Sequence, residues 1–185
     1  MKDVMVDLET LGQTPGAKIL SIGAVVFDTD GLSHEFYCEV RRDSQGGLLE
    51  DPDTLEWWLK QNAAARDRLF EDRDDKLDLD VALINFGNWM GDVAGLDAKG
   101  VPQTYVWGNG GDFDNAFLQV AYKQLDIPTP WHFWNNRCYR TLKGQWREIL
   151  LKRQGVYHNA LDDAKSQAEH AVASLNHIQR LRAAS

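Results

Sequence analysis

Acidic side chains gather at three places along this sequence, and the first is the pair Asp7 and Glu9. These two acids end an apolar run that begins at Val4. Residues i and i+2 of a strand project to the same face, so a strand here would set the two carboxylates side by side. Like charges that close repel, and a bound cation would relieve the repulsion. A solvated strand end is the alternative interpretation of this pair.

The second place is the stretch VWGNGGDFDNAFL, residues 106–118, where glycine-rich turns lead into a predicted helix. Asp112 and Asp114 stand at the start of that helix. One acid is enough to cap a helix, so the second is spare, although an ordinary N-cap remains the alternative. The three glycines of this stretch would let a backbone or a ligand approach closely.

The third place is the stretch YHNALDDA, residues 157–164. His158 directly precedes a predicted helix, and Asp162 and Asp163 lie in its first turn. A histidine that shares a helix entry with two acids can titrate usefully near neutral pH. Each of the three stretches, taken alone, also has an ordinary structural interpretation. Together, four carboxylates and one histidine suit a site with two divalent ions that acts on a phosphodiester, because hard cations such as Mg²⁺ prefer oxygen ligands.

The hydrophobic pattern predicts the elements that would position these acids. Strands are predicted at 4–8, 18–28, 34–40 and 103–108, with an Asp-Gly hairpin turn at 29–32. Helices are predicted at 54–61, 81–93, 114–125, 141–152 and 160–181. We expect Asp53 to cap the first helix, with Glu56 completing a capping box. Three strands joined by short turns and followed by alternating helices and strands indicate an α/β fold, a mixed sheet with helices on its faces.

Length, composition and charge limit the class of protein. The 185 residues, 43% hydrophobic and 26% charged, are typical of a globular chain, and we expect residues 1–185 to form a single domain. The formal net charge of −8 means that any contact with nucleic acid must be local, through metal ions or a basic patch.

Two further features of the sequence predict the cellular location of the protein. Cys38 and Cys138 lack metal-ligand spacing and indicate reduced thiols in a cytoplasmic protein. No charged-then-apolar leader opens the sequence, and no apolar run approaches the ~18 residues that a membrane helix needs. We therefore expect a cytoplasmic protein with no signal peptide and no membrane contact.

Three segments of the chain resemble the motifs of the DEDDh 3′→5′ exonucleases. The segment DLET, with Asp7 and Glu9, is similar to the first motif. The segment FDNAF, with Asp114, is similar to the second, and HNALDDA, with His158 and Asp163, is similar to the third. The three motifs occur in the family's order with the family's spacing.

The resemblance extends from residue 4 to about residue 175 and has a narrower form. The stretches DPDTLEWWLKQ, VWGNGGDFD and PWHFWNNRCYRTL resemble the subgroup that contains phage exonuclease A and the mycobacterial exoribonuclease-like proteins. The family implies a ribonuclease-H-like fold, a mixed five-stranded sheet flanked by helices. This agrees with the fold class predicted from the hydrophobic pattern.

The resemblance also implies a set of metal ligands. Asp7 would bridge two divalent cations, which are Mg²⁺ in the family's chemistry with Mn²⁺ able to substitute. Glu9 and Asp163 would complete the ligand shell of one ion, and Asp114 would hold the other. His158 would take a proton from the attacking water, a role that suits a histidine whose pKa lies near neutrality.

Matches to the family's motifs assign the remaining acids and two substrate contacts. Asp112 and Asp162 would be neighbours of the metal ligands and not ligands themselves. Thr10 and Leu11 match positions that contact the terminal sugar and wedge beside the terminal base. For Leu11, burial in the core is an equal alternative.

Aromatic and basic side chains supply the other candidate contacts with nucleic acid. Trp57, Trp58 and Trp107 could stack on bases, although core packing is favoured for Trp58 and Trp107. Residues 137–153 carry six basic residues against one acid, directly after the aromatic WHFW, and could form a phosphate track. Arg140 is the member of that stretch that lies within the subgroup motif. A helix face that balances the chain's acids is the alternative.

The sequence therefore predicts a metal-dependent 3′→5′ exonuclease that acts on single-stranded DNA or RNA 3′ ends, or short overhangs, and releases nucleoside 5′-monophosphates. A catalytically weak module that binds nucleic acid or a protein partner on the same fold is the alternative, and a ribonuclease-H-type endonuclease is the second enzyme hypothesis. The choice between RNA and DNA is not determined, because the 2′-OH is read by a few local hydrogen bonds. Exposed tryptophans leave a homodimer face open as an alternative to substrate stacking.

Overall fold

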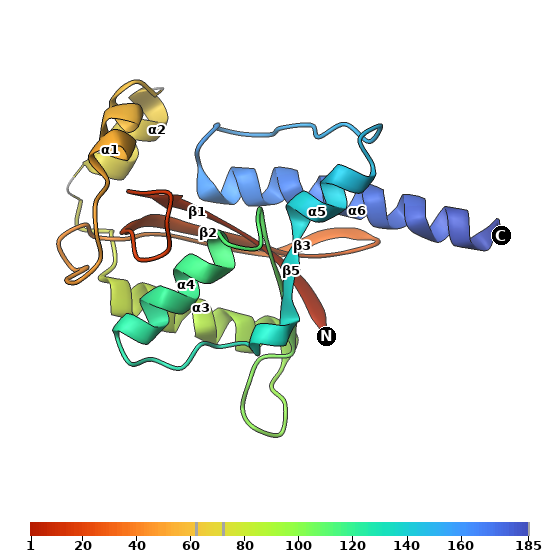
Figure 1. The fold of residues 1–185 in the computed structure, drawn as a ribbon. Helices are drawn as coiled ribbons and strands as arrows, with labels where there is room; N and C mark the ends of the chain where they lie inside the picture. Colours follow the sequence, from red (N-terminus) through yellow and green to blue (C-terminus); the bar gives the residue numbers. More distant parts are fainter. Residues whose placement is uncertain (62, 72, 185) are drawn as a thin grey trace.

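A computed structural model describes residues 1–61, 63–71 and 73–184, and its centre is one mixed sheet of five strands (Figure 1). The strands are β1 (Lys2–Thr10), β2 (Ile19–Asp28), β3 (Gly31–Glu39), β4 (Thr104–Gly108) and β5 (Asn136–Cys138). They lie in the order β3-β2-β1-β4-β5, in which β1, β2 and β3 are antiparallel neighbours and β4 and β5 run parallel to β1. The expected mixed five-stranded sheet is confirmed.

Helices cover both faces of the sheet. They are α1 (Pro52–Leu59), α2 (Ala63–Phe70), α3 (Leu79–Ala94), α4 (Asp114–Gln124), the 3-10 helix η1 (Phe133–Asn135), α5 (Tyr139–Gln145) and α6 (Ala160–Ala183). Figure 1 shows α5 and α6 on one side of the sheet, α3 and α4 on the other, and α1 and α2 beyond its far end. In the described part of the chain, no helix combines the length and the apolar character needed to cross a membrane.

The alternation of β1 explains how its acids reach one face. Val4 and Val6 pack into the core beneath α3 and α4, whereas Met5 packs into the second core beneath α5 and α6. Asp7 and Glu9 continue the odd-numbered series of Met5, because side chains of a strand alternate between faces. The two carboxylates therefore share one face, as the sequence pattern predicted, and that face is the α6 side of the sheet.

Gly23 lets α6 approach the sheet beside Asp7. It pairs with Asp7 across the β1–β2 ladder, and a Cβ atom at this glycine would lie 2.2 Å from the backbone carbon of Ala160. No side chain fits in that space, so the first turn of α6 rests directly on the backbone of β2. This contact brings the acids of the α6 start close to those of β1.

The predicted elements needed three corrections. Asp51 and not Asp53 caps α1, since the Asp51 carboxylate accepts the Asp53 N–H and Pro52 occupies the first helical position. The helix expected at 141–152 begins at Tyr139 and ends at Gln145. Beyond it the chain is held to α6, where His170 Nε2 lies 2.7 Å from the carbonyl oxygen of Ile149. Helix α2 and strand β5 were not among the elements placed from the pattern.

Candidate active site

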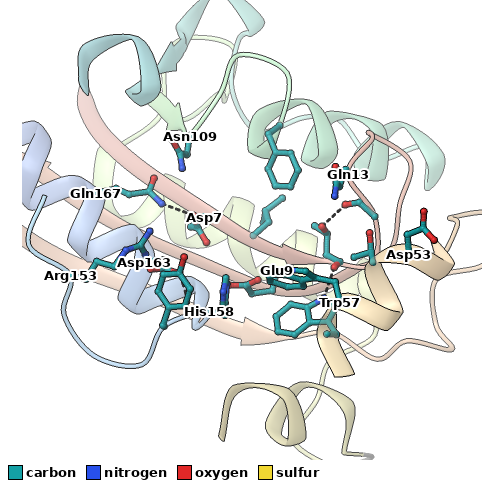
Figure 2. A pocket seen from close by; sticks show the side chains of 17 residues that line it. Asp7, Glu9, Gln13, Asp53, Trp57, Asn109, Arg153, His158, Asp163 and Gln167 are labelled. Atoms are coloured by element: carbon teal, nitrogen blue, oxygen red, sulfur yellow. Dashed lines mark hydrogen bonds and ion pairs between the residues drawn. The ribbon is translucent and has the colours of Figure 1, made fainter. Parts of the chain in front are cut away.

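A cavity of about 470 Å³ opens where β1 ends, between the start of α6 and helix α1 (Figure 2). Asp7, Glu9, His158 and Asp163 all line it, although they are up to 156 residues apart in the sequence. Figure 2 shows them around one space, with Trp57 and Asp53 on the α1 side. The structure therefore brings together three of the four predicted metal ligands and the predicted base.

Asp7 is oriented by α6. The Gln167 side chain donates from Nε2 to Asp7 Oδ1 at 2.6 Å (Figure 2). Burial, reinforced by the nearby Asp114 and Glu9 carboxylates, raises the pKa of Asp7 well above its ordinary value. Asp7 lies in surroundings that resist a lone negative charge and would favour a cation beside it.

Glu9, His158 and Asp163 form the tightest group of ligand atoms. One ligand atom from each lies within 4.8 Å of the others, a spacing that one metal ion can span. His158 Nδ1 lies 3.9 Å from Glu9 Oε1. Burial, followed by the Asp163 and Asp114 charges, raises the pKa of Glu9 to about 8. The group is acidic, mostly buried and rich in the oxygen donors that hard divalent ions prefer.

Asp163 is held by a backbone amide and by an arginine. Its Oδ2 accepts the His158 N–H at 3.2 Å, and its Oδ1 accepts Arg153 Nη1 at 2.5 Å. Burial raises the pKa of Asp163, and Arg153 acts in the opposite direction. Asn159 caps α6 by accepting the N–H groups of its first turn, which places Asp163 on the turn that faces β1.

The His158 ring stands among three aromatic rings. It makes edge contacts with Tyr157, Trp57 and Trp58, with ring centres 3.9, 4.9 and 5.8 Å away. Its backbone adopts a φ of 64°, an uncommon value for a residue with a side chain. Burial lowers the pKa of His158, and the Asp163 charge acts in the opposite direction. The ring is therefore biased toward the neutral form that can accept a proton.

Asp114 reaches the cluster from the other face of the sheet. The β1–β4 ladder ends at the Met5–Trp107 pair, and beyond it Asp114 Oδ1 accepts the Leu8 N–H at 3.2 Å. Its Oδ2 accepts the Asn109 N–H at 2.7 Å. Burial raises the pKa of Asp114 to about 6, and these N–H groups limit the rise. Asp114 thus lies behind Asp7, buried and fixed by the backbone, and does not itself line the cavity.

Of the two residues that follow Glu9, the structure brings one to the cavity. Thr10 lines it, and its hydroxyl donates to the Gly12 carbonyl at 2.7 Å. Leu11 is fully buried among Leu20, Trp58 and Leu69. The side chain turns into the core at the end of β1, which is the alternative that the sequence left open for Leu11, and its wedge contact with a base stays a prediction.

The three tryptophans differ in their burial, as the sequence suggested. Trp57 lines the cavity and is 42% exposed, so a face of its ring is available to a ligand. Trp58 is buried and donates from Nε1 to the Thr10 carbonyl, which ties α1 to the end of β1. Trp107 packs into the core beneath α5 and α6 and donates to Asp3.

The basic stretch at 137–153 is spread over several surfaces. Arg140 donates to the carbonyl of Asn109, a cavity-lining residue, at 2.6 Å, which places it just outside the cavity. Arg137 lies over the ring of Tyr105. Arg153 lines the cavity itself. The structure does not unite the stretch into one track, because it runs through β5, α5 and the following loop.

The two spare aspartates lie away from the ligand group. Asp112 is exposed in the turn before α4. Asp162 accepts the Val156 N–H at 2.7 Å and so holds the loop before α6. Asp114 and Asp163, which the motif positions implied as ligands, are the buried members of the two acid pairs.

Three functional side chains or contacts escaped the sequence interpretation. Gln167 lies four residues after Asp163, on the same face of α6, and that helical spacing was an available signal. Arg153 was noted only as one of six basic residues, and nothing in the sequence pairs it with Asp163. Gly23 gave no local signal, because it lies inside an apolar strand.

Comparison with solved structures identifies the fold. The nuclease domain of 3′hExo, a DEDDh family member bound to rAMP, is similar over 95% of this chain and 92% of that chain, with 18% identity and a TM-score of 0.63. E. coli Exonuclease I, in complex with an oligonucleotide, is similar over 97% of this chain and 41% of that chain, with 16% identity and a TM-score of 0.61. The fold is that of the ribonuclease-H-like DEDDh exonucleases.

Sequence comparison defines the family. An exodeoxyribonuclease of Enterobacteria phage T4 is 24% identical over 164 residues, which span 76% of this chain and 70% of that protein. The chain belongs to the family described as the 3'-5' exoribonuclease Rv2179c-like domain, which matches residues 2–175. It is a 3′–5′ exonuclease, and its family implies dependence on divalent metal ions. The predicted family, subgroup and activity are confirmed.

Proposed function

We propose that this exonuclease removes nucleotides from single-stranded 3′ ends and releases nucleoside 5′-monophosphates, with two divalent cations, Mg²⁺ or Mn²⁺, at the acidic cluster. The observation that carries the proposal is the convergence of Asp7, Glu9, His158 and Asp163 on one cavity.

The donor set fits divalent ions. Glu9 and Asp163 would hold one ion with Asp7, and Asp7 would share a second ion with Asp114. Each carboxylate oxygen has two acceptor positions, so Asp114 can serve an ion while it still accepts its backbone N–H groups. Burial and mutual repulsion raise the pKa values of Asp7 and Glu9, and a divalent ion would offset both effects.

The chain's own residues would carry the proton and position the end. When bound, the two ions would supply Lewis-acid stabilisation of the attacking and leaving oxygens. His158 would accept the proton of the water whose oxygen attacks phosphorus, while the bond to the 3′ oxygen of the preceding nucleotide breaks. The rings around His158 hold it in place and keep bulk water from its faces.

The candidate substrate contacts lie on the cavity or beside it. Trp57 would stack on a base, a contact that tolerates any sequence. Thr10 would contact the terminal sugar, and Arg140, beside Asn109, would approach the adjacent phosphate. The net charge of −8 gives no extended grip on a duplex, which favours a single-stranded end. The family description favours RNA, whereas the phage relative is named for DNA.

A 3′-labelled single-stranded oligonucleotide, supplied as matched RNA and DNA, tests the proposal with Mg²⁺, with Mn²⁺ and with EDTA. We expect labelled monophosphate to be released first, only when the metal is present, and wild-type activity to exceed that of Asp7→Asn on at least one substrate. A circular oligonucleotide separates the enzyme hypotheses, since an endonuclease would cut it and an exonuclease would not. Equal traces for wild type and Asp7→Asn with no shortening would contradict the proposal.

A binding module on the same fold is the alternative function. It would retain oligonucleotide affinity without releasing any nucleotide. The chain keeps all four predicted carboxylates and the histidine, with Asp7, Glu9, His158 and Asp163 on one cavity and Asp114 bonded to the Leu8 N–H of β1, which supports the enzyme instead. The single domain over 1–185, a cytoplasmic location and a homodimer stay predictions.

A further inference from the structure

Arg153 is the one lysine or arginine among the described residues that line the cavity. Its guanidinium donates to Asp163 Oδ1 at 2.5 Å and lies 4.3 Å from the centre of the Tyr157 ring. The side chain is 49% exposed and belongs to the irregular segment between α5 and α6. Figure 2 shows it beside Asp163 at the edge of the cavity.

Both oxygens of Asp163 are already engaged. Oδ2 accepts the His158 N–H, and Oδ1 accepts Arg153. The same carboxylate belongs, with Glu9 and His158, to the group whose ligand atoms lie within 4.8 Å. A divalent ion in that group would therefore meet the guanidinium as a competing cation on Asp163, and like charges repel.

The two contacts of Arg153 differ in how easily they are lost. The bond to Asp163 depends on a half-exposed, flexible side chain. The contact with Tyr157, four residues away in the same loop, would keep the guanidinium at the cavity when that bond is broken. A guanidinium has a planar fork of donors that matches two oxygens of a phosphate.

We propose that Arg153 is an exchangeable cation, which occupies Asp163 in the ion-free protein and turns to the phosphate of the bound nucleotide when a divalent ion takes Asp163. This inference rests on the proposed function and names a phosphate-binding residue for it. The competing interpretation is a permanent brace, in which Arg153 holds Asp163 in place whether or not an ion is bound.

Titration calorimetry with Mn²⁺ alone separates exchange from bracing. Arg153→Met removes the competing cation, so we expect it to bind Mn²⁺ about tenfold more tightly than wild type, the equivalent of one charge-assisted hydrogen bond. Arg153→Lys keeps the charge and should stay close to wild type. An Mn²⁺ affinity of Arg153→Met that is equal to or weaker than that of wild type would overturn the proposal.

Titration with AMP at saturating Mn²⁺ tests the second part of the proposal, in which Arg153 binds the phosphate of the nucleotide. We expect Arg153→Met to bind AMP about tenfold more weakly than wild type, with Arg153→Lys in between because an ammonium lacks the fork. Unchanged AMP affinity in Arg153→Met would overturn the phosphate contact. The opposite signs of the two effects cannot come from a general loss of structure.

Lys152→Met is the matched control, because Lys152 is the exposed basic neighbour of Arg153. It should match wild type in both titrations, and equal shifts in both variants would overturn a specific role for Arg153. The proposed function fails separately. Wild-type protein that neither binds Mn²⁺ nor shortens an oligonucleotide would overturn both claims, whereas active wild type with an unaltered Arg153→Met would overturn the inference alone.

Discussion

The acidic cluster has two halves that are held in different ways. The strand half, Asp7 and Asp114, accepts hydrogen bonds from the buried Gln167 side chain and from the backbone N–H groups of Leu8 and Asn109. The loop half, His158 and Asp163, rests against a half-exposed arginine and a set of aromatic rings.

This difference indicates that the two halves have different roles. The Leu8 N–H belongs to β1 and moves only with that strand, and Gln167 is buried on α6, so the strand half presents its oxygen atoms at nearly fixed positions. The loop half depends on side chains that can be rearranged. We expect the strand half to determine whether ions bind and the loop half to determine how an ion, a proton and a phosphate are exchanged.

The largest expected effect tests the strand half. Asp7→Asn keeps the shape of the side chain but removes the charge that both ions would share. We expect the rate of nucleotide release to fall by about 10³-fold or more, which corresponds to about 4 kcal/mol of transition-state stabilisation. Rates on a 3′-labelled oligonucleotide measure this change. Asp112→Asn, at an exposed position before α4, is the control and should retain the wild-type rate.

The next effect tests the loop half. His158→Ala removes the proposed base, and we expect a loss of about 10²-fold in rate. Because burial lowers the pKa of His158 from its ordinary 6.5, the wild-type rate should rise with pH and level off below neutrality. His158→Ala should lose that acidic limb. A variant at exposed His34 should leave it unchanged, and a limb that persists in His158→Ala would assign it to another group.

A smaller effect tests the contact that joins the halves. A methyl group at Gly23 would collide with the backbone of Ala160, so Gly23→Ala should push the start of α6 away from Asp7. We expect the free energy of unfolding to fall by about 2 kcal/mol, as for other overpacked positions. Chemical denaturation measures it. Gly46→Ala, where a Cβ would meet nothing within 4 Å, should change it by less than about 0.5 kcal/mol.

The smallest effect tests the repulsion within the cluster. Burial and Asp163 raise the pKa of Glu9 to about 8, whereas the unfolded chain has the ordinary value of 4.5. The folded state therefore binds a proton more tightly, and its stability should fall as pH rises from 4.5 through about 8. In EDTA at pH 8, Glu9→Gln should stabilise the protein, because the neutral amide is not repelled by the neighbouring acids.

Thermal melts at pH 5 and pH 8 check this expectation. The wild type should lose stability between the two values, and Glu9→Gln should lose less. Glu56→Gln is the control, because Glu56 is an exposed partner of Lys60 on α1. A stability that rises with pH in the wild type and equally in Glu9→Gln would show that Glu9 is not under repulsion.

The sequence predicted the two acids of β1 more directly than the rest of the site. The period of two along β1 places Asp7 and Glu9 on one face without knowledge of any other element. Asp114 and Asp163 could be chosen over their neighbours only through the family's motifs. The Arg153 contact depends on the path of a loop, and a loop path is determined by tertiary contacts that no local pattern reports.

Helices and strands with a strong hydrophobic periodicity were predicted correctly, whereas a helix cap was not, and the burial of a residue after a strand was left open. Strands β1 and β2 and helices α3, α4 and α6 agree with the pattern. The Asp51 cap has its signal in Pro52, which occupies the first position of α1. Leu11 could not be assigned, because an apolar residue after a strand fits a core and a binding wedge equally well.

The most direct test of the central claim is anomalous diffraction from crystals of this protein grown with Mn²⁺ and AMP. We predict two anomalous peaks within coordination distance of Asp7, one shared with Glu9 or Asp163 and the other shared with Asp114, with the Arg153 guanidinium on the phosphate. Crystals that hold Mn²⁺ elsewhere and show no peak at Asp7 would contradict the account.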